Sequence, residues 1–191
     1  FFGRRLGEMT IGIIGVGNIG KRVLHQLKGF GSPRILANDV LSSIDLDHNL
    51  EVEWVGKEKI YEQADVISIH VPLTSLTRNM IMREQLLIMK KDAILINTAR
   101  GGVINEKDLY DVLQLGHLSG VAIDVFDFEP YDGPLCEIQR CLLTSHMGSM
   151  TVDCRSQMEI EATKEAVRFI TGMPLKSGVP RCEFENQSQW I

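Results

Sequence analysis

The stretch Thr10-Ile11-Gly12-Ile13-Ile14-Gly15-Val16-Gly17-Asn18-Ile19-Gly20 decides the fold of this chain. A short apolar run ends in the pattern Gly-x-Gly-x-x-Gly, and apolar residues at helical spacing follow as far as Leu27. A strand, a glycine turn and a helix in this order aim the N–H groups of the helix start at a phosphate. Gly15 would permit the tight turn, Gly17 the close approach of a pyrophosphate, and Gly20 the close packing of helix on strand.

An acidic residue follows at the distance that a dinucleotide site requires. Asp39 comes directly after the run Ile35-Leu36-Ala37-Asn38 and nineteen residues after Gly20. Its carboxylate can accept hydrogen bonds from both hydroxyls of an adenosine ribose and would repel a 2′-phosphate. Residues 40–43 contain no Arg or Lys that would attract that phosphate, so the sequence favours NAD over NADP.

Two other interpretations of the glycine loop are open. Gly15 to Lys21 also fits the Gly-x-x-x-x-Gly-Lys pattern of nucleotide triphosphatases, but Arg22 stands where Mg²⁺ needs a Ser or Thr. The loop could also be a glycine-rich turn that binds no ligand, an interpretation that Asp39 weakens.

The overall composition narrows the class of protein. The 191 residues, 44% of them hydrophobic, suffice for one domain with a full core, or one domain and a fragment. With 20 basic and 25 acidic residues the net charge is −5, which argues against a nucleic-acid partner. No apolar run is long enough to span a membrane, and no signal peptide is visible. The cysteines lack metal-site spacing, so we expect no metal and read them as free thiols of a cytoplasmic protein; they are Cys136, Cys141, Cys154 and Cys182.

Apolar runs and helical patterns alternate along the chain. This alternation predicts an α/β fold, a Rossmann-type doubly wound parallel sheet with helices on both faces. The expected strands are residues 11–14, 35–38, 52–55, 66–69, 93–96, 120–123 and 142–144. The expected helices are residues 19–27, 57–64, 83–89, 106–115 and 151–171, with Asn105 as the N-cap of the fourth.

Polar side chains follow the carboxyl ends of several of these strands. They are His70, Thr98, Arg100, Asp124 and His146. In a doubly wound sheet this edge is where ligands bind, so we expect these residues to form a site.

Three of the polar residues suit a defined chemistry. The guanidinium of Arg100 can hold a carboxylate through two hydrogen bonds, and the imidazole of His146 can exchange a proton with an alcohol or carbonyl oxygen. Glu129 could hold the imidazole in one tautomer and raise its pKa. Each also has a structural interpretation, as an Arg paired with local acids, a hydrogen-bonded turn histidine and a solvated loop acid. The other histidines are read as structural: His25, His48 and His117.

From about Leu6 to Pro180, the chain resembles the nucleotide-binding domain of the D-isomer-specific 2-hydroxyacid dehydrogenases. The motifs that carry the resemblance are Gly15-Val-Gly-Asn-Ile-Gly20, His70-Val-Pro-Leu-Thr74 with Thr77, Asn97-Thr-Ala-Arg-Gly-Gly102, Gly120-Val-Ala-Ile-Asp-Val-Phe-x-x-Glu-Pro130 and Ser145-His-Met-Gly148. The resemblance implies an NAD-dependent oxidoreductase of D-2-hydroxy acids, with hydride transfer between the nicotinamide and the 2-carbon of the acid.

The resemblance also implies roles for single residues. Arg100 would bind and polarise the 2-oxo acid, His146 would exchange a proton with the carbonyl oxygen, and Glu129 would orient His146. The cofactor contacts that it implies are Gly15, Gly17, Asn18, Ile19, Gly20, Asp39, His70, Val71, Pro72, Thr77, Thr98, Ala99, Arg100, Asp124, His146 and Gly148.

The resemblance further implies a domain organisation and partners. Residues 1–180 would form the NAD-binding domain and residues 181–191 a tail, while the substrate domain of the family is largely absent from this sequence. The partners would be a small 2-hydroxy or 2-oxo acid and a second copy of the chain, without nucleic acid or membrane. The alternative function is an NAD(H)-sensing binding or scaffold module, like the corepressors that resemble this family.

Overall fold

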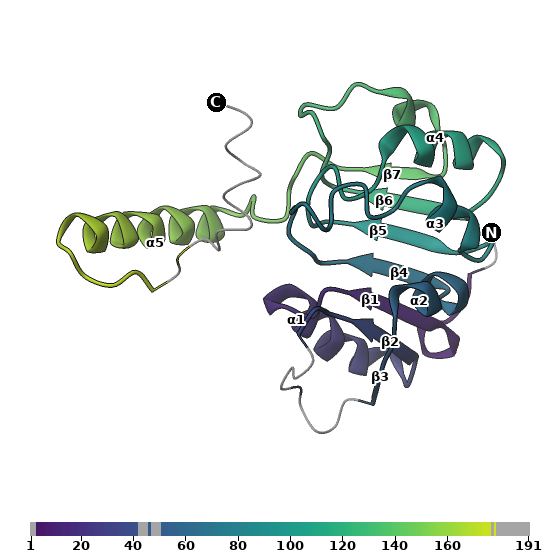
Figure 1. Ribbon diagram of the computed structural model, residues 1–191, viewed down its shortest axis with the longest axis horizontal. Helices are drawn as coiled ribbons and strands as arrows, with labels where there is room; N and C mark the ends of the chain where they lie inside the picture. Colours follow the sequence, from purple (N-terminus) through teal and green to yellow (C-terminus); the bar gives the residue numbers. More distant parts are fainter. Residues whose placement is uncertain (1–2, 42–45, 47–50, 177, 179–191) are drawn as a thin grey trace. The chain divides into compact units, whose positions relative to one another are not determined.

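Seven parallel strands form one sheet in the computed structural model, which describes residues 3–41, 46, 51–176 and 178. The strands are β1 (Thr10–Ile14), β2 (Arg34–Asn38), β3 (Val52–Trp54), β4 (Val66–Ile69), β5 (Ile94–Asn97), β6 (Gly120–Ile123) and β7 (Cys141–Leu143). Their order across the sheet is β3-β2-β1-β4-β5-β6-β7 (Figure 1). The chain reverses its direction of winding between β1 and β4, and this confirms the predicted Rossmann-type topology.

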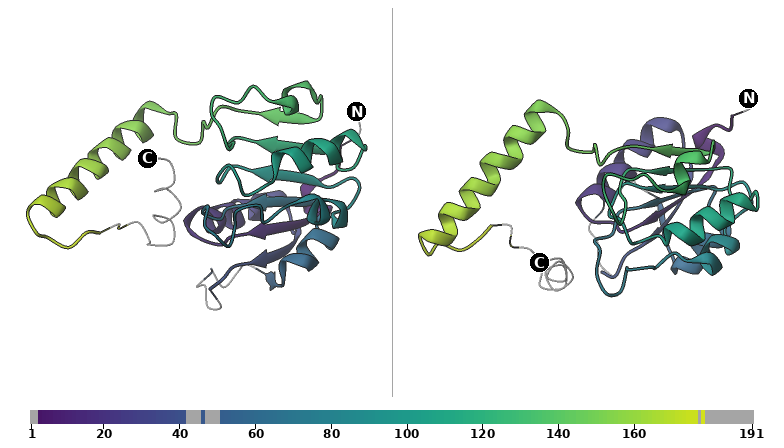
Figure 2. Two further views of the ribbon diagram at one scale, coloured as in Figure 1. Left: turned by 45° about the horizontal axis from the view of Figure 1, so that its top comes forward. Right: turned by 90° about the horizontal axis from the view of Figure 1, so that it is seen from above.

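Five helices occur in the described part of the chain. They are α1 (Asn18–Leu27), α2 (Lys57–Gln63), α3 (Arg83–Ile88), α4 (Glu106–Gln114) and α5 (Val152–Ile170), and short 3-10 turns occur at Leu6–Glu8, Lys28–Phe30 and Pro134–Glu137. Within residues 1–145, α1 covers one face, while α2, α3 and α4 cover the other (Figure 2). Two apolar cores result, one on each face of the sheet.

The chain divides into two compact units, residues 1–145 and residues 146–191. The first unit holds the whole sheet. In the second unit, α5 begins after Thr151, whose side chain accepts a hydrogen bond from the Cys154 N–H. The predicted single domain over residues 1–180 stays a prediction, and the predicted tail at 181–191 lies outside the described residues. No helix in the described part of the chain is long and apolar enough to cross a membrane.

The predicted strands and α-helices differ from the observed ones only at their ends, and the three 3-10 turns were not predicted. The strand expected at 142–144 is Cys141–Leu143, one residue earlier. Asn105 caps α4 as predicted, because its side-chain oxygen accepts the Asp108 N–H at 3.0 Å.

Three cysteines lie in the described part of the chain, and all three are free thiols: Cys136, Cys141 and Cys154. Cys182 lies outside the described residues.

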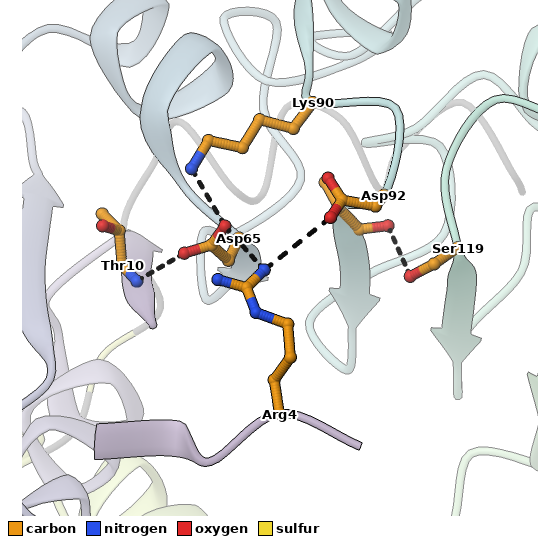
Figure 3. Close-up of polar contacts among 7 residues, drawn as sticks. Arg4, Thr10, Asp65, Lys90, Asp92 and Ser119 are labelled. Carbon is orange, nitrogen blue, oxygen red and sulfur yellow. Dashed lines mark hydrogen bonds and ion pairs between the residues drawn. The ribbon is translucent and has the colours of Figure 1, made fainter. Parts of the chain in front are cut away.

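A buried carboxylate joins the sheet to the N-terminal segment at the amino end of β4. One oxygen of Asp65 accepts the Thr10 N–H at 2.7 Å, and the other lies 2.9 Å from Lys90 Nζ and 3.0 Å from Arg4 Nη1 (Figure 3). Burial raises the pKa of this carboxyl, but these three hydrogen bonds outweigh burial and lower the pKa to about 2. Asp65 is therefore ionised in the folded protein across the physiological range.

Acid should weaken the fold through Asp65. An unperturbed Asp takes up its proton near pH 3.8 and the folded one only near pH 2, so the stabilisation is complete above about pH 4 and disappears as the pH falls toward 2. Its size is about 2 kcal/mol. Asp65→Asn should lose about that much free energy of unfolding at pH 7 and flatten the decline between about pH 4 and pH 2, as measured by urea unfolding.

The matched control is Asp92→Asn. Asp92 is a second partner of Arg4, at 3.8 Å, but its side chain is 70% exposed. This variant should stay within about 0.5 kcal/mol of the parent. Equal losses in the two variants would contradict the role given to the buried carboxylate.

Candidate functional site

The glycine loop after β1 is shaped by two close backbone contacts and one open position. Gly15 has φ +92°, and a Cβ added there would lie 2.6 Å from the His70 carbonyl oxygen. A Cβ on Gly20 would lie 2.1 Å from the carbonyl oxygen of Gly15. A Cβ on Gly17 would meet nothing within 4 Å. Two glycines therefore close the loop against the sheet, and the third leaves room for a ligand to approach the backbone.

The start of α1 is suited to an anion. Gly17 is the N-cap and offers no capping side chain, and the first turn of the helix holds no acidic residue. Its N–H groups, which include those of Asn18 and Ile19, carry the partial positive charge of the helix start. The loop and the helix together therefore fit the pyrophosphate of a dinucleotide.

Asp39 lies against this loop, while its predicted contact with the adenosine ribose stays a prediction. One carboxylate oxygen accepts the Val16 N–H at 2.6 Å, and the other accepts the Leu41 N–H at 2.9 Å. These bonds hold the carboxylate beside the residues that would approach the pyrophosphate. A ribose next to that pyrophosphate would be within reach of Asp39.

The register of the sheet places the other candidate residues along one edge. Ile69 pairs with Ile14 and with Asn97, and Asn97 pairs with Ile123. The residues that follow these strand ends therefore leave the sheet side by side. They include His70, Thr98 and Asp124.

Two of the edge residues have partners within the fold. A ring nitrogen of His70 lies 2.9 Å from the Ser68 hydroxyl, and burial lowers the pKa of His70, which favours the neutral ring. Asp124 is only 7% exposed and accepts a 2.5 Å hydrogen bond from the Thr144 hydroxyl. This bond ties the end of β6 to the residue after β7.

Thr77 shapes the loop that follows β4. Its hydroxyl donates to the Pro72 carbonyl at 2.6 Å and accepts the Thr74 N–H at 2.7 Å. These bonds fix the segment that contains Val71 and Pro72. The predicted cofactor contacts of Val71, Pro72 and Thr77 stay predictions.

Arg100 lies in a tight turn after β5 and is exposed. The guanidinium folds back on its own turn, where Nη1 donates to the Ala99 carbonyl at 2.6 Å. A Cβ on Gly101 would lie 2.0 Å from the Phe126 carbonyl oxygen, so the turn is in direct backbone contact with the segment after β6. That segment leads to Glu129. The structure therefore fixes the two turns that carry Arg100 and Glu129 against each other.

The loop of Glu129 is closed by contacts that the sequence analysis missed. The Phe126 N–H donates to Glu129 Oε1 at 3.1 Å, and the rings of Phe126 and Tyr131 stack with centroids 4.2 Å apart. Glu129 and Tyr131 line a cavity of about 400 Å³ together with Thr144 and Ser145. The sequence contains one signal for this contact, since Phe126 and Tyr131 flank Glu129-Pro130 at a spacing of five residues. Whether their rings touch depends on the path of the loop, which the sequence does not show.

His146 and Gly148 belong to the second unit. His146 follows the last residue of the first unit and has φ +53°, a left-handed conformation that costs energy in a residue other than glycine. Its predicted contacts with Arg100 and Glu129 stay predictions, as does the cofactor contact of Gly148.

A ring nitrogen of His117 lies 3.0 Å from the Met89 carbonyl oxygen, in keeping with the structural interpretation of this histidine. His48 lies outside the described residues.

No metal centre is formed by the described side chains, since no group of three or more His, Cys, Asp and Glu residues among them is placed to hold an ion.

Alanine at two of the glycines should separate folding from ligand binding. Gly20→Ala should lower the free energy of unfolding by more than about 2 kcal/mol, because the new Cβ collides with backbone. Gly17→Ala should stay within about 1 kcal/mol of the parent, yet weaken binding of NADH by about tenfold or more, because the methyl group occupies the approach of the pyrophosphate. Urea unfolding and fluorescence titration with NADH measure the two effects. Unchanged NADH binding in Gly17→Ala would show that the dinucleotide does not cross this loop.

Comparison with known proteins identifies the family. The family described as "D-isomer specific 2-hydroxyacid dehydrogenase, NAD binding domain" matches residues 1–148. Among curated relatives, a glyoxylate reductase of Korarchaeum cryptofilum is 42% identical over 165 residues, which are 85% of this chain and 49% of the relative. A D-3-phosphoglycerate dehydrogenase of Methanocaldococcus jannaschii is 40% identical over 174 residues, 90% of this chain and 33% of the relative. The chain thus spans half or less of the length of these relatives.

Solved structures agree with this family. The NAD-dependent formate dehydrogenase of Staphylococcus aureus, in complex with NAD, has a TM-score of 0.82 and 32% identity over 91% of this chain and 52% of its own. The D-lactate dehydrogenase of Aquifex aeolicus, complexed with NAD and lactic acid, has a TM-score of 0.81 and 31% identity over 90% of this chain and 56% of its own. The chain therefore belongs to the D-isomer specific 2-hydroxyacid dehydrogenase family and forms its NAD-binding domain.

Proposed function

We propose that the protein that carries this chain transfers a hydride between NAD and the 2-carbon of a D-2-hydroxy or 2-oxo acid. The observation that carries the proposal is the arrangement along one sheet edge. A glycine loop with one open position and an adjacent Asp39 lies at the end of β1, and the Arg100 turn lies at the end of β5. This arrangement supports a dinucleotide site and, at the same edge, an arginine that would bind the carboxylate of the substrate, since α/β proteins bind their ligands there.

The residues of this chain would bind, orient and move a proton. Bound NAD supplies the hydride chemistry. Gly17 and the start of α1 would hold the pyrophosphate, and Asp39 the adenosine ribose. Arg100 would hold the carboxylate of the acid through two hydrogen bonds and polarise the oxygen on its 2-carbon.

We propose His146 as the group that gives a proton to that oxygen in reduction and removes it in oxidation. Glu129 would orient the imidazole and stabilise its protonated form. Phe126 supports this role of Glu129, because its N–H donates to one oxygen of the carboxylate and holds that side chain in its loop.

The alternative, an NAD(H)-sensing scaffold module, is less well supported. Curated relatives are named as glyoxylate reductase, D-3-phosphoglycerate dehydrogenase and hydroxypyruvate reductase. The three residue types of the proposed mechanism are all present in this chain as Arg100, Glu129 and His146. A homodimer is a proposal that rests on the family resemblance alone, and a cytoplasmic location is a proposal that rests on the described cysteines being free thiols.

His146→Ala should reduce the turnover number by about 10²- to 10⁴-fold, as expected for the loss of a general acid and base. The measurement is NADH oxidation with glyoxylate or hydroxypyruvate, made on the protein that carries this chain. His25→Ala is the matched control, since His25 is an exposed residue of α1, and it should leave turnover unchanged. Equal turnover in the parent and His146→Ala would remove His146 from the mechanism.

Asp39→Asn should weaken the preference for NADH over NADPH. The amide keeps one oxygen that can accept the Val16 N–H, so the glycine loop should stay in place. The exposed Leu41 N–H loses its acceptor, and the charge that repels a 2′-phosphate is lost. We expect the ratio of the NADPH and NADH dissociation constants to fall by about tenfold in fluorescence titrations. The matched control is Asp111→Asn, on α4, which should leave this ratio unchanged. An unchanged ratio in Asp39→Asn would show that the charge of Asp39 does not cause the preference for NADH.

A further inference from the structure

Asn97 is a buried polar residue at the centre of the candidate site, and neither the predicted site nor the proposed mechanism gives it a role. It ends β5 and is only 2% exposed. A buried amide group costs free energy unless its donor and acceptor are both paired, so its partners show what it holds in place.

Both ends of the Asn97 amide bond to the turn that carries Arg100. Oδ1 accepts the Ala99 N–H at 3.1 Å, and Nδ2 donates to the Arg100 carbonyl at 2.9 Å. The Ala99 carbonyl, between these two groups, accepts the Arg100 guanidinium. Hydrogen bonds therefore hold three successive peptide groups of the turn, those between residues 98 and 101. The side chain of Asn97 holds two of the three.

The backbone of Asn97 is anchored as firmly as its side chain. It pairs with Ile69 of β4 and Ile123 of β6, and its carbonyl accepts the Asp124 N–H at 3.0 Å. On the far side of the turn, Gly101 lies so close to the backbone of Phe126 that a Cβ would not fit between them. The direction in which the Arg100 side chain leaves the backbone is thus set from both sides.

We propose that Asn97 is a positioning residue, which aims the Arg100 guanidinium at the carboxylate of the 2-oxo acid. This inference rests on the proposed function, because it takes Arg100 as the carboxylate ligand. A purely structural Asn97 would matter for stability and would affect all ligands alike. A positioning Asn97 matters for the 2-oxo acid and leaves NADH binding at the glycine loop intact.

Two variants remove the hydrogen bond to the Arg100 carbonyl. In Asn97→Ser the hydroxyl can still accept the Ala99 N–H, as Ser does in turns, but it cannot reach the Arg100 carbonyl. In Asn97→Asp the shape is kept, and a carboxylate oxygen faces the carbonyl oxygen in place of the N–H donor. If the buried charge of Asn97→Asp prevents folding, the neutral Ser variant decides the test.

The measurements are kcat and KM for glyoxylate, the dissociation constant of NADH, and the melting temperature. We expect kcat/KM for glyoxylate to fall by about tenfold to a hundredfold in Asn97→Ser, mainly through KM, because a misdirected ligand group loses orientation. The dissociation constant of NADH should change by less than about twofold, which corresponds to about 0.4 kcal/mol.

The matched control is Asn105→Asp. Asn105 also holds backbone with its side chain, but at the start of α4, where Asp caps equally well. It should leave kcat/KM unchanged. An unchanged kcat/KM in Asn97→Ser, or parallel losses in glyoxylate turnover and NADH binding, would overturn the proposal.

A separate measurement distinguishes this inference from the proposed function. If the parent protein reduces no 2-oxo acid, the proposed function fails, but the ordering of Arg100 can still be measured from the ¹⁵N relaxation of its Nε–H group. Greater mobility of this group in Asn97→Ser than in the parent or Asn105→Asp would support the positioning role. Equal mobility in all three would overturn it.

Discussion

The candidate site depends on the register in which β1, β4, β5 and β6 pair. Ile14, Ile69, Asn97 and Ile123 form one row across the sheet, so four loops begin at the same edge. A shift of one residue in any strand would turn its side chains to the opposite face and displace the loop that follows. Because the apolar cores lie on both faces, such a shift would also move side chains from one core into the other and disturb the packing of both. The folding energy of the sheet therefore fixes the site.

Close backbone contacts turn this common edge into a defined site. Gly15 against His70 and Gly20 against Gly15 leave no space for a Cβ, and neither does Gly101 against Phe126. The contacts of Gly15 with His70 and of Gly101 with Phe126 join loops that belong to different strands. Gly17 is the contrast, since the space around it is open in the folded protein. The same residue type thus serves close packing in three places and access for a ligand in the fourth.

The two edges of the sheet use charged groups differently. At the amino edge Asp65 is fully engaged by Thr10, Lys90 and Arg4, and its low pKa reports the stability that it adds. At the carboxyl edge Arg100 is exposed and its described hydrogen bond is to its own turn, so its guanidinium can take a carboxylate. Stability and ligand binding are thus placed at opposite ends of the strands, and Asn97 links the carboxyl edge to the core.

The sequence by itself determined the fold class, the strands and helices to within one or two residues, the glycine loop with Asp39 after the next strand, and the family. These features are local, because apolar periodicity and motif spacing are written along the chain. The tertiary structure alone decided which loops touch: the contact of Gly101 with Phe126, the stacking of Phe126 on Tyr131, the network around Asp65, and the hold of Asn97 on the Arg100 turn. These contacts join residues whose proximity follows from strand order and register, and neither quantity is encoded in any short stretch of sequence.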